Sequence, residues 1–410
     1  MIKDLQTAVV EANYDWSYIK IIDDDVVGYG ECFFAPGLTA VVRELKPLVV
    51  GGDSFDIRRL LHNLRTAGFM ASPHGGVLHH AMAAIEAALW DIVGKRLAVP
   101  VYKLWGGAYR RRLRLYADCH AGEGLASLNS INAPRVPWWL GAEDTDAVPL
   151  EVHPRYHGGR SAEAIGVDIG AYTKRAGEAV EEGYTAVKFD LDIPNPYARD
   201  DYNRMLSPQE LELLVEVVAA VREAVGPTID VAVDCHWNFS AESAIAAAKA
   251  LAPHNLMWLE DPVPPGSDEA FRRVVRESAT PVATGEHHYL ATQFAHLLEA
   301  GLLIVAPDLQ KTGLIEGRRI ADLAELYTAS VAPHNIASSL GTLQAAGLMP
   351  RISLREAGNL GLKSIPLEGK NLELEIGLMR LVDSGTNNAV AAFTRLAKAI
   401  VPKMVPRAEK

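Results

Sequence analysis

The sequence predicts an α/β protein in which a closed parallel barrel follows an N-terminal α+β block. From Leu113 onward, short apolar runs typical of strands alternate with helix-like segments, and this alternation indicates a parallel sheet. Three of the runs lead, at equal spacing, to Asp234, Glu260 and Glu286, as expected when successive strand–helix repeats bring acids to one rim. The 410 residues exceed one barrel of about 250 residues and leave room for a second domain.

The first block, residues 1–110, is expected to be an α+β domain. Its strand-like pieces are WSYIKII (16–22) and VVGYGEC (26–32), which are joined by an acidic turn. Helical stretches follow and end in HHAMAAIEAALWDIVGKRL (79–97), whose apolar residues recur at helical spacing.

Residues 111–365 carry the strand–helix repeat of the barrel. Eight apolar runs are expected to be strands, the last being the weakest: 113–119, 184–190, 229–234, 256–260, 281–285, 302–308, 329–333 and 351–354. Helices are expected between them at 163–182, 207–225, 240–252, 267–278, 289–300 and 313–328. Eight alternating strands imply closure of the sheet. Residues 366–410 lose this rhythm and are expected to pack back on the first block.

One segment, residues 122–160, interrupts the alternation with prolines and tryptophans and has no clear period. A long loop after the first barrel strand lies on the catalytic face, where it would serve as a lid or specificity loop. A contact between subunits explains the segment equally well.

Composition narrows the possible partners and location. The net charge of −11 argues against nucleic acid or an anionic membrane as a partner. Three cysteines without a spacing pattern fit a reducing compartment. The N-terminus lacks the features of a signal peptide, and no apolar run reaches transmembrane length. We therefore expect a cytoplasmic protein.

The three equally spaced acids predict a metal site. In a parallel barrel the carboxyl ends of all strands open on one face, so Asp234, Glu260 and Glu286 should converge there. Converging carboxylates repel one another unless a cation lies between them. Hard oxygen ligands suit Mg²⁺, which keeps open positions for a substrate. Asp261 directly follows Glu260, so alternation points it away, and a structural role is expected.

Candidate catalytic residues surround these acids. Lys188 and Asp190 share one side of their strand, and a lysine beside the metal would neutralise a substrate carboxylate or a developing enolate; a structural ion pair is the alternative. His236, two residues after Asp234, would give a proton to a departing hydroxyl or else orient Asp234.

Two further residues predict a general base. Asp308 ends LLIVAPD and His334 ends ASVAPH, on strands adjacent in the barrel. A carboxylate beside an imidazole fixes its tautomer and raises its basicity. Across from a three-carboxylate metal site, this dyad is expected to remove a proton from the substrate.

These motifs together resemble the enolase superfamily, and within it the mandelate racemase subgroup. AAIEAALWDIVGKRLAVPVYKLWGG is similar to the segment that joins the family's capping domain to its barrel, and WLEDP, GE, APD and APH are similar to its local motifs. The resemblance covers nearly the whole chain. It implies a modified (β/α) TIM-type barrel with an α+β capping domain built from both chain ends, Mg²⁺ on the three acids, and a homo-oligomer.

The resemblance also implies chemistry, namely removal of the proton α to a carboxylate. Racemases of the subgroup carry a second lysine where this chain has Asp190, which disfavours racemisation. The Asp234-x-His236 pattern resembles sugar-acid dehydratases. We therefore expect a Mg²⁺-dependent dehydratase that takes a small-molecule carboxylate, an aldonic acid, and yields a 2-keto-3-deoxy acid. A cycloisomerase and an epimerase or racemase acting through the same enediolate are the alternatives, with a non-catalytic binding barrel as a third.

Four residues complete the predicted site. Glu356, near the end of the eighth strand, lies roughly where the subgroup keeps an acid that hydrogen-bonds the enediolate; a helix cap or surface role is the alternative. Phe33 of the capping domain and His287 are expected to contact the substrate with Asp190, although packing between domains also explains Phe33. Lys311 is expected to support His334 rather than to act as the base.

Overall fold

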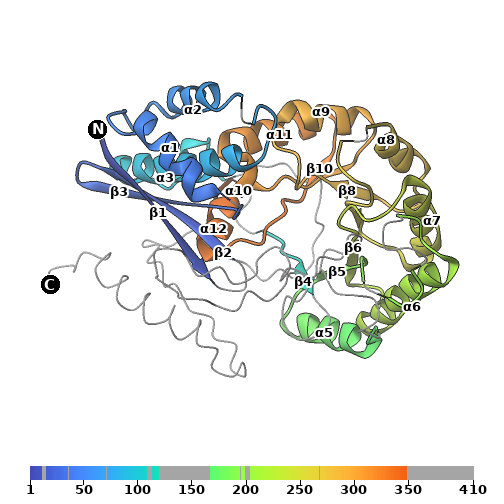
Figure 1. Cartoon of the computed structure of the whole chain (residues 1–410). Coiled ribbons are helices and arrows are strands. Elements are labelled where there is room, and N and C mark those ends of the chain that lie inside the picture. The colour runs from blue at the N-terminus through green and yellow to red at the C-terminus, as the bar shows by residue number, and fades with distance from the viewer. Residues whose placement is uncertain are drawn as a thin grey trace, which may run out of the picture.

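The computed structural model describes residues 1–11, 15–35, 37–70, 72–108, 113–119, 167–193, 195–198, 204–266 and 268–348. They form an antiparallel sheet with helices beside a curved parallel sheet with helices along its outer side (Figure 1). The loop 122–160, the expected eighth strand 351–354 and the segment 366–410 lie outside the described residues. The boundaries 1–110, 111–365 and 366–410 remain predictions.

The capping sheet has three antiparallel strands in the order β1-β2-β3, namely β1 (Ile2–Glu11), β2 (Asp15–Asp23) and β3 (Val26–Cys32). β2 and β3 match the two predicted strands. β1 was not predicted. Its pairing with β2 shifts register between Ile2 and Asp4, and such a shift breaks the alternation that reveals a strand in a sequence.

Two helices, α1 (Leu38–Val49) and α3 (Val77–Leu97), pack on this sheet, and α2 (Ile57–Ala67) and the short α4 (Val101–Leu104) pack on α3. α3 matches the predicted helix and packs closely on β3. A Cβ atom on Gly28 or Gly30 would overlap the backbone oxygen of Ala88 or Ala84 in α3. Glycine at these two positions therefore permits the short distance between helix and sheet.

The barrel sheet has seven parallel strands in chain order, each hydrogen-bonded to the next: β4 (Ala117–Cys119), β5 (Ala186–Asp190), β6 (Asp230–Asp234), β7 (Leu259–Glu260), β8 (Val282–Thr284), β9 (Ile304–Val305) and β10 (Ser330–Val331). Every strand lies within a predicted one. The register pairs Asp190 with Asp234 and Asp234 with Glu260, so these acids lie level at one rim.

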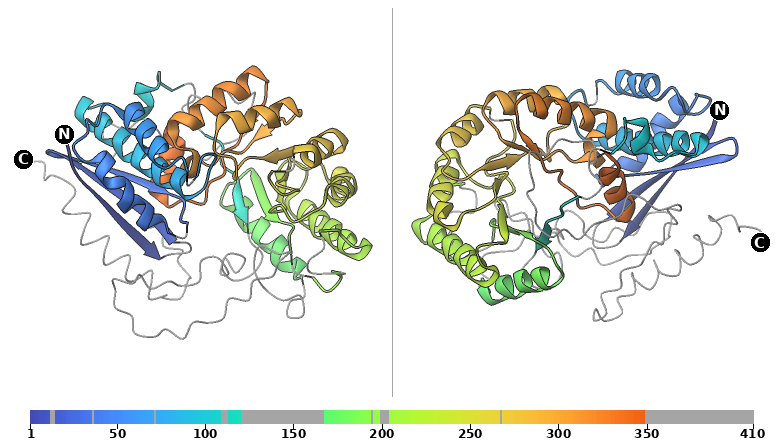
Figure 2. Two further views of the ribbon diagram at one scale, coloured as in Figure 1. Left: turned by 45° about the horizontal axis from the view of Figure 1, so that its top comes forward. Right: turned by 180° about the vertical axis from the view of Figure 1, so that it is seen from behind.

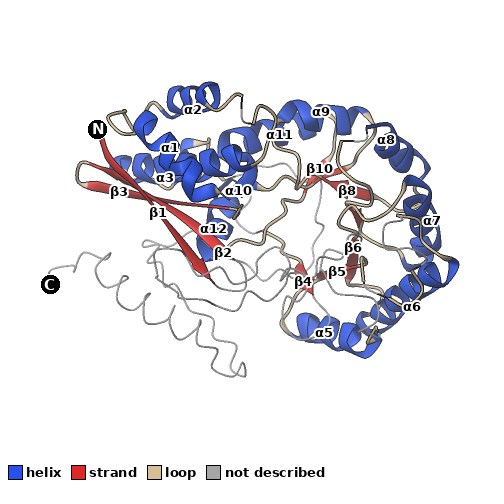
Figure 3. Cartoon of the chain, in the orientation of Figure 1, coloured by secondary structure: helices blue, strands red, loops and turns tan. Residues whose placement is uncertain are grey.

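Helices line the outer side of this sheet (Figures 2 and 3). They are α5 (Ile169–Glu181), α6 (Pro208–Val225), α7 (Ala241–Leu251) with a 3₁₀ turn (Ala252–His254), α8 (Asp268–Glu277), α9 (Ala291–Glu299) and α11 (Leu314–Leu326). Two further helices, α10 (Leu309–Thr312) and α12 (Ser339–Leu348), pack on α3 and β3 of the capping domain. Six match predicted helices, whereas α10 and α12 were not predicted. None of the helices described is long and apolar enough to span a membrane.

Successive side chains along each barrel strand point alternately toward the surrounding helices and toward the inside of the barrel. Val187 and Phe189 of β5, with Val231 and Val233 of β6, belong to the large apolar cluster shared with the helices. Lys188 lies between the first two, so its side chain is on the opposite, inner side. This arrangement places a buried cation inside the barrel.

One buried carboxylate, that of Glu31, helps to hold the capping domain against the β9–β10 side of the barrel. Glu31, on β3, accepts hydrogen bonds from Ser338 N at 2.8 Å, Gly341 N at 2.9 Å and Gln310 Nε2 at 2.9 Å. These donors belong to α10, to α12 and to the loop between β10 and α12. Glu31 thereby fixes the capping domain beside the rim.

Candidate active site

Three buried carboxylates meet at the carboxyl ends of neighbouring strands. Asp234 ends β6, Glu260 ends β7, and Glu286 follows β8. All three are at most 5% exposed. One oxygen of Glu260, Oε1, is buried and has no hydrogen-bond partner among the described residues.

The electrostatics of this cluster differ from one acid to the next. Burial, above all, raises the pKa of Glu260 to about 7; Lys188 opposes the shift, whereas Asp234 and Glu286 add to it. Burial also acts to raise the pKa of Asp234, but His236 and Lys188 outweigh it and bring that pKa to about 2.

The donor set fits a divalent cation. Oxygens of Glu260, Asp261 and Glu286 lie within 4.8 Å of one another, and so do ligand atoms of Asp190, Asp234 and His236. Carboxylates are the ligands that hard cations prefer, and the unpartnered Oε1 of Glu260 offers one directly.

The expectation that Asp261 points away from Glu260 was wrong. Its φ of 41° turns the chain out of the strand conformation, which brings its carboxylate close to those of Glu260 and Glu286. Asp261 Oδ1 accepts a hydrogen bond from Thr284 Oγ1.

Lys188 is brought into the carboxylate cluster, as its strand position predicts. Its Nζ lies 2.6 Å from Asp234 Oδ2, 3.4 Å from Glu260 Oε2 and 3.8 Å from Asp118 Oδ1. Burial disfavours the ammonium, but these three acids raise the pKa of Lys188 well above its usual value. Lys188 therefore stays a cation at the rim.

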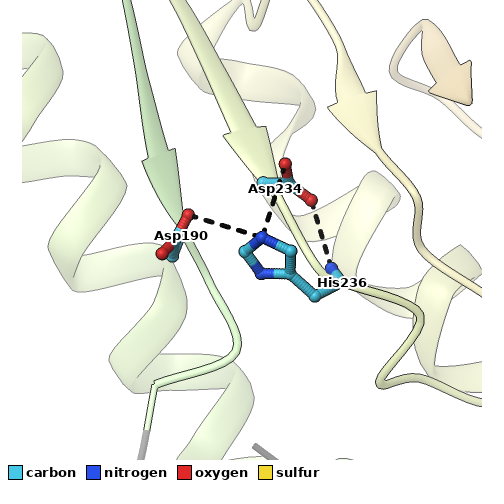
Figure 4. A group of neighbouring side chains, drawn as sticks. All are labelled: Asp190, Asp234 and His236. Atoms are coloured by element: carbon cyan, nitrogen blue, oxygen red, sulfur yellow. Dashed lines mark hydrogen bonds and ion pairs between the residues drawn. The ribbon is translucent and has the colours of Figure 1, made fainter. Parts of the chain in front are cut away.

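His236 lies beside the Asp234 end of the cluster (Figure 4). Its Nε2 is 3.8 Å from Asp234 Oδ2 and 4.0 Å from Asp190 Oδ1, while its backbone N–H donates to Asp234 Oδ1 at 3.1 Å. Burial acts to lower the pKa of His236, but Asp192, Asp234 and Asp190 raise it well above the ordinary value. A protonated His236 can act as an acid toward a group at this rim.

Asp308 and His334 form the predicted dyad. Asp308 Oδ2 lies 2.8 Å from His334 Nδ1, and His334 Nε2 lies 2.8 Å from Glu286 Oε2. Burial acts to lower the pKa of His334, but Glu286 and Asp308 together raise it to about 10. The imidazole therefore connects the dyad to the acid cluster.

The remaining predicted residues gather around Glu286. Lys311 Nζ lies 4.0 Å from Glu286 Oε1 and 4.4 Å from the centre of the Phe33 ring, which comes from the capping domain. His287 Nε2 lies 3.1 Å from Glu286 Oε1, and the His287 ring packs against Trp237. Glu356 lies outside the described residues.

Comparison with known families agrees with this geometry. Residues 6–106 match the model of the mandelate racemase / muconate lactonizing enzyme N-terminal domain, and residues 171–366 match the enolase C-terminal domain-like model. The chain belongs to the mandelate racemase subgroup of the enolase superfamily. The predicted fold class, a TIM-type barrel with a capping domain, is thereby confirmed.

Two relatives with similar sequences are named as dehydratases. The chain is 38% identical to the D-xylonate dehydratase of Haloferax volcanii over 84% of this chain and 74% of that one. It is 31% identical to the D-galactonate dehydratase of Ralstonia nicotianae over 78% and 71%. A mandelate racemase/muconate lactonizing enzyme-like protein from Rubrobacter xylanophilus has a similar structure, with a TM-score of 0.73 and 37% identity over 86% and 84%.

Two residues of this site were not predicted from the sequence. Asp192 contacts His236, and Trp237 packs on His287. The Asp190-x-Asp192 spacing could have indicated the first. Trp237 and His236 both have positive φ, 61° and 40°, and this conformation redirects the chain after β6 in a way that strand alternation does not anticipate.

Proposed function

We propose that the protein is a sugar-acid dehydratase, which removes the α-proton and the 3-hydroxyl of an aldonic acid to give a 2-keto-3-deoxy acid. The observation that carries the proposal is the placement of two histidines around one acid cluster. His334 contacts Glu286 at 2.8 Å, and His236 lies 3.8 Å from Asp234. An elimination of water needs a base for the proton and an acid for the hydroxyl, and two histidines supply both.

The proposed roles follow from these positions. His334 takes the α-proton from the substrate, and Asp308 holds its Nδ1 proton. His236 donates a proton to the departing 3-hydroxyl. Lys188 stabilises negative charge on the substrate carboxylate, because it remains a buried cation at the rim.

Four other residues would contact the substrate. His287 contacts Glu286, Phe33 of the capping domain packs against Lys311, and Asp190 lies next to His236. Aspartate at position 190 suits the hydroxyls of a sugar acid, to which a carboxylate accepts hydrogen bonds. Glu356 is proposed from the sequence alone as a hydrogen-bond partner of the enediolate.

The proposed metal is Mg²⁺, with Asp234, Glu260 and Glu286 as the residues that would hold it. Ligand atoms of Glu260 and Glu286 fall in one group of close donors, and those of Asp234 in the other. When bound, the metal would stabilise the extra negative charge that develops on the substrate carboxylate. Its expected place agrees with the unpartnered Glu260 Oε1.

Epimerisation is the second candidate, because Lys311 provides another cation at the site. Its Nζ lies 4.0 Å from Glu286 Oε1 and is buried. A lysine there would reprotonate the α-carbon if it acted from a face other than that used by His334. Asp190 argues for dehydration, since racemases of the subgroup carry a lysine at that position.

The proposal also covers the partners, the cellular location and the oligomeric state of the enzyme. Its partner would be a small-molecule carboxylate, and neither nucleic acid nor membrane is expected to bind. The described cysteines, Cys32, Cys119 and Cys235, are buried thiols, as expected for a protein of the reducing cytoplasm. A homo-oligomer is expected from the subgroup.

A substrate screen tests this function. The purified protein with Mg²⁺ is incubated with aldonic acids, including xylonate and galactonate, and semicarbazide detects 2-keto products. We expect a 2-keto-3-deoxy product from at least one pentonic or hexonic acid. Deuterium entering recovered substrate from D₂O without loss of water, for every acid tried, would instead favour the epimerase.

A further inference from the structure

Asp192 lies beside the site on the short segment that follows β5. It is buried, and its neighbour Leu191 donates its backbone N–H to Asp234 O at 2.6 Å. This hydrogen bond extends the β5–β6 pairing by one step beyond the strand end. Asp192 is thereby held level with the residues that follow Asp234 on the next strand.

Both oxygens of the Asp192 carboxylate have defined partners. Oδ1 lies 2.8 Å from His236 Nδ1, and Oδ2 accepts a hydrogen bond from Asn238 Nδ2 at 3.1 Å. A carboxylate held at both oxygens cannot rotate without losing one of these contacts. Asp192 therefore presents a fixed acceptor to one particular nitrogen of His236.

The backbone around His236 is also fixed, which leaves the ring as the adjustable part. His236 N–H donates to Asp234 Oδ1 at 3.1 Å, and Trp237 N–H donates to Asp261 O at 2.7 Å. With the backbone held, the contact at Nδ1 sets the ring orientation. Nε2 then faces Asp190 and Asp234, as Figure 4 shows.

The same arrangement occurs a second time at the rim. His334 Nδ1 lies 2.8 Å from Asp308 Oδ2, and His334 Nε2 faces the carboxylate of Glu286. His236 Nδ1 lies 2.8 Å from Asp192 Oδ1, and its Nε2 faces the carboxylate of Asp234. Each histidine thus has one ring nitrogen on a buried aspartate and the other directed to the acid cluster.

We propose that Asp192 is a positioning residue for His236, which holds the proton on Nδ1 and so directs the Nε2 proton to the leaving hydroxyl of the substrate. This inference rests on the proposed dehydration. In the step itself, the electron pair left on the substrate by removal of the α-proton forms a double bond between carbons 2 and 3. The C–O bond at carbon 3 breaks, its electron pair leaves with the oxygen, and the Nε2 proton joins that oxygen to complete the water molecule. Asp192 accepts the Nδ1 hydrogen bond throughout and does not itself transfer a proton.

The test is the variant Asp192→Asn, with Asp230→Asn as its matched control. Asp230 begins β6, at the opposite end of the strand from the site, and pairs with Arg114 at 2.6 Å. Reaction in D₂O yields two rates, namely deuterium exchange into recovered substrate and loss of water. In Asp192→Asn the ratio of exchange to water loss should rise at least about 10-fold, because the α-proton is still removed while the hydroxyl leaves slowly. Asp230→Asn should keep the wild-type ratio.

An unchanged ratio in Asp192→Asn would overturn the inference, whether the two rates fall together or not at all. If that variant does not fold, Asn238→Ser, which removes the contact to Asp192 Oδ2, should raise the same ratio to a smaller degree, and an unchanged ratio there would also overturn it. A wild-type protein that dehydrates no aldonic acid would contradict the proposed function instead. In that case, the ¹⁵N signals of the His236 ring would be compared between wild type and Asp192→Asn. Identical ring signals would show that Asp192 does not hold the Nδ1 proton.

Discussion

His334 Nε2 lies 2.8 Å from Glu286 Oε2, so the imidazole of the Asp308 dyad also contacts one of the three acids proposed to hold the metal. Burial acts to lower the pKa of His334, and the interaction with Glu286 is the largest of those that raise it. A divalent cation bound to Glu286 would offset the charge of that carboxylate and make His334 easier to deprotonate. The acid cluster and the proposed base are therefore electrostatically linked.

The two histidines should differ in which step they control. His334→Asn should slow both α-proton exchange and water loss by about 10²–10⁴-fold, because the base is removed. His236→Asn should slow water loss by a similar factor while exchange in D₂O continues, since Asp308 and His334 remain intact. Mass spectrometry of recovered substrate gives the first rate, and 2-keto product gives the second. Exchange lost in both variants would contradict this division of roles.

Metal affinity should depend on pH through Glu260. Its pKa of about 7 means that a proton competes with the cation below that pH, and the carboxylate is ready to bind above it. Affinity for Mg²⁺ should therefore rise as pH increases from 6 to 8 and then level off. Isothermal titration calorimetry at several pH values measures this directly.

Glu260→Gln tests the same point by removing the charge. The variant should bind Mg²⁺ about 10- to 100-fold more weakly, with less dependence on pH. It should also lose exchange activity, which is the result expected for the wild type after chelation with EDTA. Glu242→Gln, on the exposed side of α7, serves as the matched control. Equal affinity in Glu260→Gln and wild type would exclude Glu260 as a ligand.

Regular periodicity explains what could be predicted from the sequence. The six predicted helices of the barrel bury one face, so their apolar residues recur with a period of 3.6, whereas the parallel strands are buried on both faces and stand out as short apolar runs between helices. Asp234 and Glu260 end such strands, and Asp308 and His334 follow β9 and β10 by three residues, so the order of the strands brings all four to one rim. The site could be anticipated wherever a residue ended a regular strand.

Irregular backbone explains what was missed. Asp192 lies after its strand has ended, and a hydrogen bond from Leu191 to Asp234 carries it into the site. Asp261 is turned toward the cluster by a φ of 41°. The register shift in β1 interrupts the alternation of its side chains, so the strand could not be recognised from the sequence. None of these follows from side-chain alternation, because each depends on a contact with a distant part of the chain.

The close packing of β3 on α3 predicts a large effect from one methyl group. In Gly30→Ala the new Cβ would overlap Ala84 O, a backbone atom inside a helix that cannot move aside. The free energy of unfolding should fall by about 1–3 kcal/mol. In Gly177→Ala, within α5, the new Cβ meets nothing within 4 Å, and a gain of about 0.4–1 kcal/mol is expected. Denaturant unfolding compares the two; a neutral Gly30→Ala would show that the capping sheet can separate from α3.

The buried acid Glu86 should make stability depend on pH. It lies in α3 and accepts a hydrogen bond from Ile315 N at 2.7 Å, across the junction between capping domain and barrel. Within α3 it also accepts a hydrogen bond from Trp90 Nε1 at 3.1 Å. Burial, above all, raises its pKa from 4.5 to about 7, although these hydrogen bonds act against the shift. Its protonated form is therefore the one favoured by folding.

The sign follows from linkage. Because the folded pKa exceeds the unfolded one, the contribution of Glu86 is fully present below pH 4.5 and is lost as pH rises through about 7, amounting to at most about 3 kcal/mol. Glu86→Gln keeps an oxygen acceptor but cannot ionise. The free energy of unfolding should therefore fall less between pH 5 and pH 9 in this variant than in the wild type, with Glu44→Gln, an exposed residue of α1, as control. Parallel pH profiles for wild type and Glu86→Gln would mean that Glu86 is ionised in the folded protein at pH 5, its charge stabilised by the Ile315 and Trp90 hydrogen bonds.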